Sequence, residues 1–186
     1  MSRRDDLVAT AVKLFRKNGY HATGVDKILS ESGVSKPTLY RHFDSKDDLI
    51  VAALKKWDID CRAWLIGAME ERGDTPRDRL LALFDVLHDW FDDSDFQGCM
   101  FINATVEFAD QDNPIHLVAR EHKQTFAAQI RDIVASARAK DPADVTSALM
   151  LLMEGAIVTA HIYGKNEAAK RAKAIARTIL AEAQIN

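Results

Sequence analysis

Cysteine is scarce in this chain, with only Cys61 and Cys99 among 186 residues. The two lie far apart and outside any CxxC or Cys/His cluster, so we expect neither a disulfide framework nor a structural zinc site. The first residues lack the apolar stretch of a signal peptide, and we recognise no apolar run approaching the ~18 residues that a membrane span requires. These absences predict a soluble, cytoplasmic protein with reduced thiols.

Strand and enzyme signals are equally sparse. Val, Ile and Tyr recur at helical spacing rather than in alternating runs. The sequence contains no GxSxG nucleophile motif, no phosphate-binding loop and no dinucleotide fingerprint. We therefore expect no catalytic residues and no cofactor, in a protein that is not an enzyme.

Proline is rare, and three of the four prolines directly follow a residue that caps helices, in Thr75-Pro76, Asn113-Pro114 and Asp141-Pro142. Each pair marks a helix start, because proline suits the first turn of a helix. With the apolar periodicity these signals predict an all-α chain of about nine helices. The expected helices cover 3–18, the segment after Thr23 to near Gly33, 36–43, Ser45 to about Glu71, 75–92, 99–110, 113–139, 142–163 and 165–184.

Charge is distributed unevenly along the chain. Residues 1–56 hold 11 Lys/Arg and 7 Asp/Glu, whereas residues 57–186 hold 14 and 21. A basic segment joined to a larger acidic one suggests that the N-terminal part meets a polyanion. Chance unevenness on solvated faces would give the same counts, so charge alone leaves both interpretations open.

The most informative segment runs from Gly33 to Phe43 and reads GVSKPTLYRHF. Gly33 suits the left-handed residue that ends one helix, and Ser35 is a good N-cap for the next. Leu39 and Phe43 then lie four residues apart on one inward face, which leaves the polar side chains free to project elsewhere. A short helix presented in this way can contact the phosphates and base edges of DNA.

Residues 3–56 resemble the DNA-binding domain of the TetR/AcrR family of transcriptional regulators. The residues that carry the resemblance are Ala11, Leu14, Phe15, Gly19, Tyr20, Thr23, Val25, Ile28 and the run GVSKPTLYRHFDSKDDL from Gly33 to Leu49. The resemblance implies a three-helix helix-turn-helix DNA-binding domain over residues 1–46. It also implies a larger helical ligand-binding and dimerisation domain over residues 47–186.

A helix-turn-helix lays its second helix in the major groove, and this geometry together with the resemblance predicts the contact residues. The predicted DNA-binding set is Thr23, Ser35, Lys36, Pro37, Thr38, Tyr40, Arg41, His42 and Lys46. Lys36, Thr38 and Arg41 are expected to read bases. Thr23 and Lys46 are expected at helix N-termini, where backbone N–H groups favour phosphate. The alternative is a structural three-helix subdomain whose basic and aromatic residues are ordinary surface.

Pro37 departs from the resembled family, many members of which have Gly or Ala at this position. Proline is tolerated in a first turn, but it removes a backbone N–H and adds a rigid ring at the groove surface. The operator sequence therefore cannot be inferred from a relative.

The last two predicted helices carry apolar stripes at three- and four-residue steps. The stripes are Val145, Leu149, Leu152, Ala156, Thr159 and Tyr163 on the first helix, and Ala168, Ala172, Ile175, Ala176, Ile179 and Ala183 on the second. In the resembled family these two helices pair with those of a second subunit, which implies a homodimer. Packing within one chain is the alternative that the stripes leave open.

The C-terminal body also offers aromatic, methionine and isolated polar side chains for a small-molecule pocket. The predicted ligand-binding set is Trp64, Phe84, His88, Phe91, Asn103, Glu107, His122, Met153, Glu154, Ile157 and His161. Core packing is the alternative for each of them. Without an HxxxH or HExxH pattern we expect no metal site. Cys99 is either a redox sensor, if exposed, or a small buried hydrophobe.

These observations predict a homodimeric, cytoplasmic transcriptional regulator, a repressor that a small molecule releases from its DNA operator. The alternative is a helical small-molecule-binding protein or enzyme whose N-terminal module is structural. An activator or a non-specific DNA organiser is a third interpretation.

Overall fold

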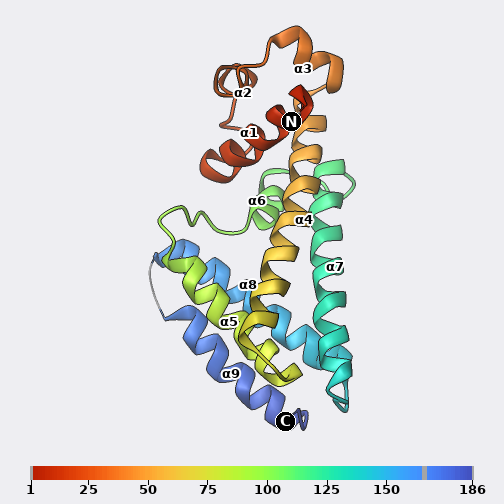
Figure 1. The fold of residues 1–186 in the computed structure, drawn as a ribbon, viewed down its shortest axis with the longest axis vertical. Helices are drawn as coiled ribbons and strands as arrows, with labels where there is room; N and C mark the ends of the chain where they lie inside the picture. Colours follow the sequence, from red (N-terminus) through yellow and green to blue (C-terminus); the bar gives the residue numbers. More distant parts are fainter. Residues whose placement is uncertain (1, 165–166, 186) are drawn as a thin grey trace. The chain divides into compact units, whose positions relative to one another are not determined.

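The structure is a computed structural model that describes residues 2–164 and 167–185. Over these ranges the chain forms nine helices and no strands, which confirms the all-α prediction (Figure 1). The helices are α1 (Arg3–Asn18), α2 (Val25–Ser32), α3 (Lys36–His42), α4 (Lys46–Arg72), α5 (Pro76–Asp92), α6 (Met100–Glu107), α7 (Pro114–Ser136), α8 (Pro142–Tyr163) and α9 (Ala168–Glu182). The start predicted for the last helix at residue 165 lies outside the described residues.

The capping residues open their helices as the sequence predicts. Thr75 Oγ1 accepts a hydrogen bond from the Asp78 N–H at 3.1 Å, and Asn113 Oδ1 accepts one from the Ile115 N–H at 2.8 Å. Asp141 caps α8 in the same way as Thr75 caps α5. These bonds satisfy backbone donors that have no partner within a helix, so each helix start is fixed by its own neighbours in sequence.

Contacts divide the chain into two compact units. Unit 1 contains Met1–Asp60 and Cys99–His122, and unit 2 contains Cys61–Gly98 and Lys123–Asn186. Helices α4 and α7 therefore contribute residues to both units. This division follows packing rather than function, and the functional boundary expected after residue 46 stays a prediction.

In unit 1, helices α1, α2 and α3 pack against one another and form a three-helix head. Leu7, Ala11 and Phe15 lie on one stripe of α1, and all three are buried. Ile28 of α2 and Leu39 of α3 are fully buried as well. Each short helix of the head thus contributes apolar surface to one shared core, as the periodicity predicts.

In unit 2, helices α5, α8 and α9 pack against one another. Ala172 and Ala176 of α9 are buried, as are Leu149 and Ala156 of α8. Small side chains on α9 let the helices approach closely. This part of the predicted stripes therefore packs within one chain, which was the alternative to a dimer contact.

A different face of α8 is apolar and exposed. Leu151 is 71% exposed, Ile162 is 64% exposed, and Val158 and Gly155 are exposed between them. On α9, Ile175 is also exposed. The spacing of 151, 155, 158 and 162 places these α8 residues along one side of the helix. The surface open to a second subunit thus includes Ile175, Thr159 and Tyr163 of the predicted stripes together with an α8 face that the stripes do not contain, and the dimer contact stays a prediction.

By length and composition, α8 is also the one helix in the described part of the chain that is apolar enough to cross a membrane. This differs from the expectation, drawn from the sequence, that no apolar run approaches that length. Within the chain, 44% of its most apolar 18-residue window is buried, and core helices of soluble proteins pass the same test. Some of the apolar residues of α8 therefore lie in the core of unit 2, and others lie on its surface.

The turn between α4 and α5 depends on Gly73. A Cβ added there would lie 2.4 Å from the backbone nitrogen of Arg79, while at Gly67, inside α4, a Cβ would meet nothing within 4 Å. We predict that Gly73→Ala lowers the free energy of unfolding by about 1–3 kcal/mol, because the backbone must shift. Gly67→Ala should raise it by about 0.5–1 kcal/mol through helix propensity. Urea denaturation of both variants checks the opposite signs, and equal effects would contradict the steric argument.

Candidate nucleic-acid interface

The turn before α3 has the geometry that its sequence predicts. Gly33 adopts the left-handed conformation at φ 65°, and its N–H donates to the Leu29 carbonyl at 3.0 Å, which ends α2. Val34 is buried, and Ser35 occupies the N-cap position of α3. A side chain at Gly33 would strain this backbone, so glycine allows the sharp reversal between the two helices.

Helix α3 presents a polar face away from the core. Leu39 and Phe43, which are 0% and 5% exposed, hold one side of the segment in the head. Lys36, Tyr40 and Arg41 are exposed. Lys36 and Tyr40, four residues apart, are neighbours on the helix surface, and Arg41 lies about 100° further round, so the three form a broad exposed face. This face combines two cations with an aromatic hydroxyl, the side chains that contact phosphates and guanine edges.

The start of α3 is more constrained than the sequence indicates. The Ser35 hydroxyl does not cap the backbone but lies 2.9 Å from the Thr38 hydroxyl, which sets the orientation of both. Pro37 has no N–H, and the Thr38 N–H already donates to the Ser35 carbonyl. Two of the first-turn positions of α3 therefore offer a phosphate no free main-chain donor.

The structure corrects the phosphate contact predicted for Thr23. Its side chain is 0% exposed, and its hydroxyl donates to the Gly19 carbonyl at 2.7 Å. Helix α2 begins at Val25, with Gly24 at the N-cap position, so Thr23 does not open the helix as predicted. Its side chain stabilises the turn inside the head and is not accessible to a phosphate.

Lys46 is the first residue of α4, and acidic residues follow it in the same turn. The Ser45 hydroxyl accepts from the Asp48 N–H at 3.1 Å and donates to the Asp48 carboxylate at 2.9 Å, as the predicted cap requires. Asp47 and Asp48 both lie in the first turn. Their negative charges occupy the positive end of the helix, so a phosphate contact at this position depends on the Lys46 side chain alone.

Sequence reasoning did not predict a role for Arg4. Its guanidinium lies 5.3 Å from the centre of the Phe43 ring, in cation–π geometry. This contact ties the start of α1 to the end of α3. No local sequence pattern predicts this cation–π contact, because Arg4 and Phe43 are far apart in the sequence.

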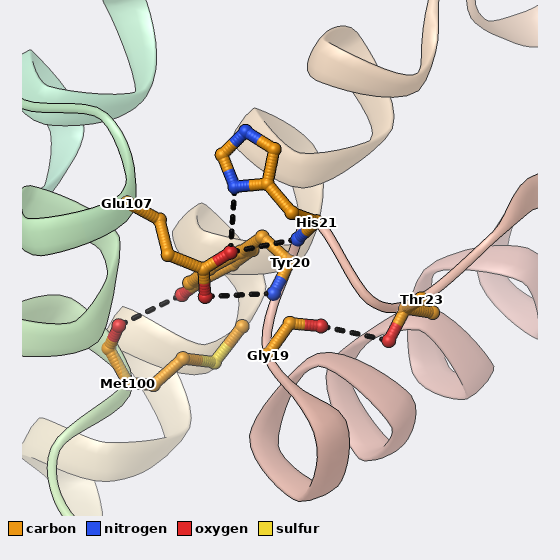
Figure 2. A network of polar contacts seen from close by, with 6 residues as sticks. All are labelled: Gly19, Tyr20, His21, Thr23, Met100 and Glu107. Atoms are coloured by element: carbon orange, nitrogen blue, oxygen red, sulfur yellow. Dashed lines mark hydrogen bonds and ion pairs between the residues drawn. The ribbon is translucent and has the colours of Figure 1, made fainter.

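A carboxylate from α6 holds the turn between α1 and α2 (Figure 2). Glu107 Oε1 accepts from the Tyr20 N–H at 2.9 Å, and Oε2 accepts from the His21 N–H at 2.7 Å. The His21 ring nitrogen Nδ1 is also 2.7 Å from Oε2. At the other end of α6, the Tyr20 hydroxyl donates to the Met100 carbonyl at 2.8 Å.

The charge of Glu107 is stabilised where it lies. Burial acts to raise the pKa of this carboxyl, but the hydrogen bonds from the His21 and Tyr20 N–H groups and the His21 side chain outweigh burial and lower it. The group is therefore ionised at neutral pH and acts as a charge-assisted acceptor. Glu107 was predicted to bind ligand, but both of its oxygens are engaged by the head.

Comparison with known proteins identifies the fold that presents α3 in this way. A family model described as bacterial regulatory proteins of the tetR family matches residues 7–53, and one described as the C-terminal domain of tetracyclin repressor-like proteins matches residues 76–176. The chain belongs to the TetR family. Two solved structures share the arrangement over nearly the whole length.

SCO4454, a TetR-family transcriptional regulator from Streptomyces coelicolor, is 27% identical, with a TM-score of 0.88 over 97% of this chain and 89% of that chain. The tetR-type regulator sav143 from Streptomyces avermitilis is 30% identical, with a TM-score of 0.89 over 100% of both chains. The HTH-type transcriptional regulator YjdC of Escherichia coli K12 is 24% identical over 155 residues, which cover 83% of this chain and 81% of that protein. The chain is thus a DNA-binding transcriptional regulator of the TetR type, a family in which ligand response and repression are typical.

Some of the effector contacts predicted for this TetR regulator fall in unit 1. His122 is buried, its Nδ1 lies 2.6 Å from Asp58 Oδ1, and its ring stacks on Phe101 with centres 3.5 Å apart. His122 and Asp58 line a surface hollow of about 310 Å³. Asn103 lies half-buried on α6. His122 is thus held by its neighbours as a buried polar core residue would be.

In unit 2, aromatic rings form a cluster of Trp64, Trp90, Phe91, Phe96 and His161. Trp64, Phe91 and His161 were predicted as ligand contacts, whereas Trp90 and Phe96 were missed. Phe96 lies in the connection after α5, outside any helix, so helical periodicity could not predict that it is part of the cluster. The structure brings these rings together, with Trp64 and His161 partly exposed.

Four other predicted effector residues lie on α5 or α8 and are buried or half-buried: Phe84, His88, Met153 and Ile157. Glu154 instead pairs with Lys123 at 3.5 Å and lines an open groove of about 520 Å³ between α7 and α8. Cys99 is 8% exposed, which favours the small buried hydrophobe over the redox sensor. Effector contacts in this TetR regulator stay a prediction.

The lowered pKa of Glu107 predicts how the free energy of unfolding depends on pH in the acid range. The carboxylate stabilises the folded state above its ordinary pKa of 4.5, and this stabilisation is lost as the pH falls through the lower pKa of the folded state. We expect Glu107→Gln to cost about 1–3 kcal/mol of unfolding free energy at pH 7. The difference from the wild type should shrink below about pH 4.5. Urea midpoints between about pH 3 and 7 measure it, and a pH-independent difference would contradict the ionised clamp.

Proposed function

We propose that this regulator is a homodimer that reads an operator with α3 and is released from it by a small molecule. The observation that carries the proposal is the exposed face of Lys36, Tyr40 and Arg41, on a helix anchored by buried Leu39 and Phe43. A helix that is anchored by buried side chains and carries exposed cations fits the major groove. TetR-family regulators bind operator DNA, typically as dimers with small-molecule effectors, and are in general soluble and cytoplasmic.

The side chains of α3 divide into two roles in this proposal. Lys36 and Arg41 donate to guanine acceptors or phosphate, and Thr38 contacts a base from the flank of the same helix. Tyr40, His42 and Lys46 contact the backbone and fix the register. Ser35 orients Thr38 through their 2.9 Å hydroxyl contact, and Pro37 shapes the surface without donating.

The dimer forms through α8 and α9. Leu151, Gly155, Val158 and Ile162 are arranged symmetrically about the point between Ala156 and Ile157, so an antiparallel two-fold crossing there sets Leu151 against Ile162 of the partner subunit. The same crossing sets Gly155 against Val158 of the partner subunit, where glycine permits close approach. Ile175 of α9 adds exposed apolar area. A dimer also matches the two half-sites of an operator.

Release by an effector is a shift between two populations of the dimer, one of which fits the operator. A differential affinity of the effector for the two states of ~1–3 kcal/mol changes operator affinity ~5–150-fold. In this proposal the chain binds its effector in the body at residues 47–186 and works in the cytoplasm without catalysing a reaction. The rival is a helical carrier or enzyme with a structural head, and DNA binding separates the two.

Replacing both Lys36 and Tyr40 by alanine tests the interface. Because both side chains are exposed, the double variant should fold normally while binding a duplex from upstream of its own gene about tenfold more weakly or worse. Lys140→Ala removes an exposed lysine outside the head and serves as the control. A gel-shift titration across salt concentrations measures both. Binding that has no sequence preference and survives the double substitution would refute the regulator proposal.

Leu151→Glu tests the dimer. A carboxylate on the exposed α8 face should convert the protein to a monomer, because a dimer would bury the charge without a partner. Ile59→Glu is the matched control, since Ile59 is 62% exposed on α4, away from α8 and α9 in the sequence. Light scattering coupled to size exclusion gives the mass. If Leu151→Glu stays dimeric, the dimer does not use this face.

A further inference from the structure

The turn between α1 and α2 is fastened by a residue distant in the sequence. The N–H groups of Tyr20 and His21 both donate to Glu107, which lies 87 and 86 residues away. Two donors on the two oxygens of one carboxylate fix both position and orientation, more than a single hydrogen bond does. Figure 2 shows the carboxylate of Glu107 reaching from α6 to these two N–H groups.

The backbone at Gly19 is shaped for this contact. Gly19 has φ 82°, and a Cβ added there would lie 2.9 Å from Glu107 Oε1. Glycine therefore serves twice, by allowing the turn and by leaving room for the carboxylate. The Phe108 ring stacks on the His21 ring at 4.9 Å and meets the Tyr20 ring edge-on at 5.9 Å, which closes the site from the α6 side.

The fastened turn lies directly between the two helices that carry α3. Both α1 and α2 pack against α3, so the direction of the turn sets the direction of the recognition helix. Within the turn, the buried Thr23 hydroxyl donates to the Gly19 carbonyl. In the described part of the chain, the Glu107 carboxylate thus bonds to the turn and to no residue of helices α1, α2 or α3 themselves.

We propose that Glu107 is a positioning residue for operator binding, through which α6 holds α3 in the orientation that fits DNA. This inference rests on the proposed function. When the two bonds from the turn to Glu107 are lost, the head samples orientations that do not match two half-sites.

Glu107→Gln separates positioning from simple electrostatics. Removing a negative charge from a protein of net charge −3 would by itself favour binding to DNA. Loss of positioning acts in the opposite direction, because glutamine keeps one acceptor oxygen and turns an NH₂ group toward the other backbone donor. We expect affinity to fall in the order wild type, Glu107→Gln, Glu107→Ala, with about a tenfold loss for alanine.

The experiment is a fluorescence anisotropy titration of a labelled duplex from upstream of the protein's own gene. It is run well below the lowest melting temperature of the variants and at several salt concentrations. The salt slope should stay that of the wild type, because no phosphate contact is removed, whereas Lys36→Ala should reduce it by ~0.9 if Lys36 neutralises one phosphate. Glu121→Gln, an exposed glutamate on α7 of the same unit, controls for charge and should bind as tightly as the wild type or more tightly.

The outcomes are distinct. If Glu107→Gln binds as tightly as Glu121→Gln, the positioning role is wrong while the regulator proposal stands. A reduced salt slope for Glu107→Gln also overturns it, because the residue would then act at the DNA contact itself. A wild type without sequence preference removes the proposed function and with it this inference. Should Glu107→Ala not fold, Glu107→Gln decides alone.

Discussion

The burial of Leu39 and Phe43 is the interaction on which the candidate interface depends. Helix α3 has seven residues, and a helix of that length does not persist on its own in water. Its backbone is kept helical by the apolar side that it contributes to the head. The exposed polar side chains of α3 are thus held in place because Leu39 and Phe43 are buried in the head.

Local chemistry was predictable from the sequence because its causes are local. Gly33, Thr75 and Asp141 end or begin helices through bonds to residues three or four positions away. Both partners of each bond therefore lie within one short stretch of sequence. The inward pair Leu39 and Phe43 follows from helical spacing for the same reason.

Longer-range features were not predictable in this way. Glu107 was recognised as a polar residue in need of a partner, but nothing in the spacing points to Tyr20 and His21. Thr23 was misplaced because a threonine just before a helix resembles a cap, whereas its hydroxyl turns inward. On α8 two faces are apolar, and periodicity alone does not say which of them the core occupies.

The buried phenol of Tyr20 has a further consequence for how such a head responds to its surroundings. Burial, together with nearby Cys99 and Glu107, raises the pKa of Tyr20 far above its ordinary value, so its O–H remains a donor to the Met100 carbonyl throughout the physiological range. Glu107 is ionised over the same range. The Tyr20 hydroxyl and the Glu107 carboxylate therefore both keep their protonation state when the pH drifts around neutrality, so these two parts of the attachment between the head and α6 do not depend on pH there.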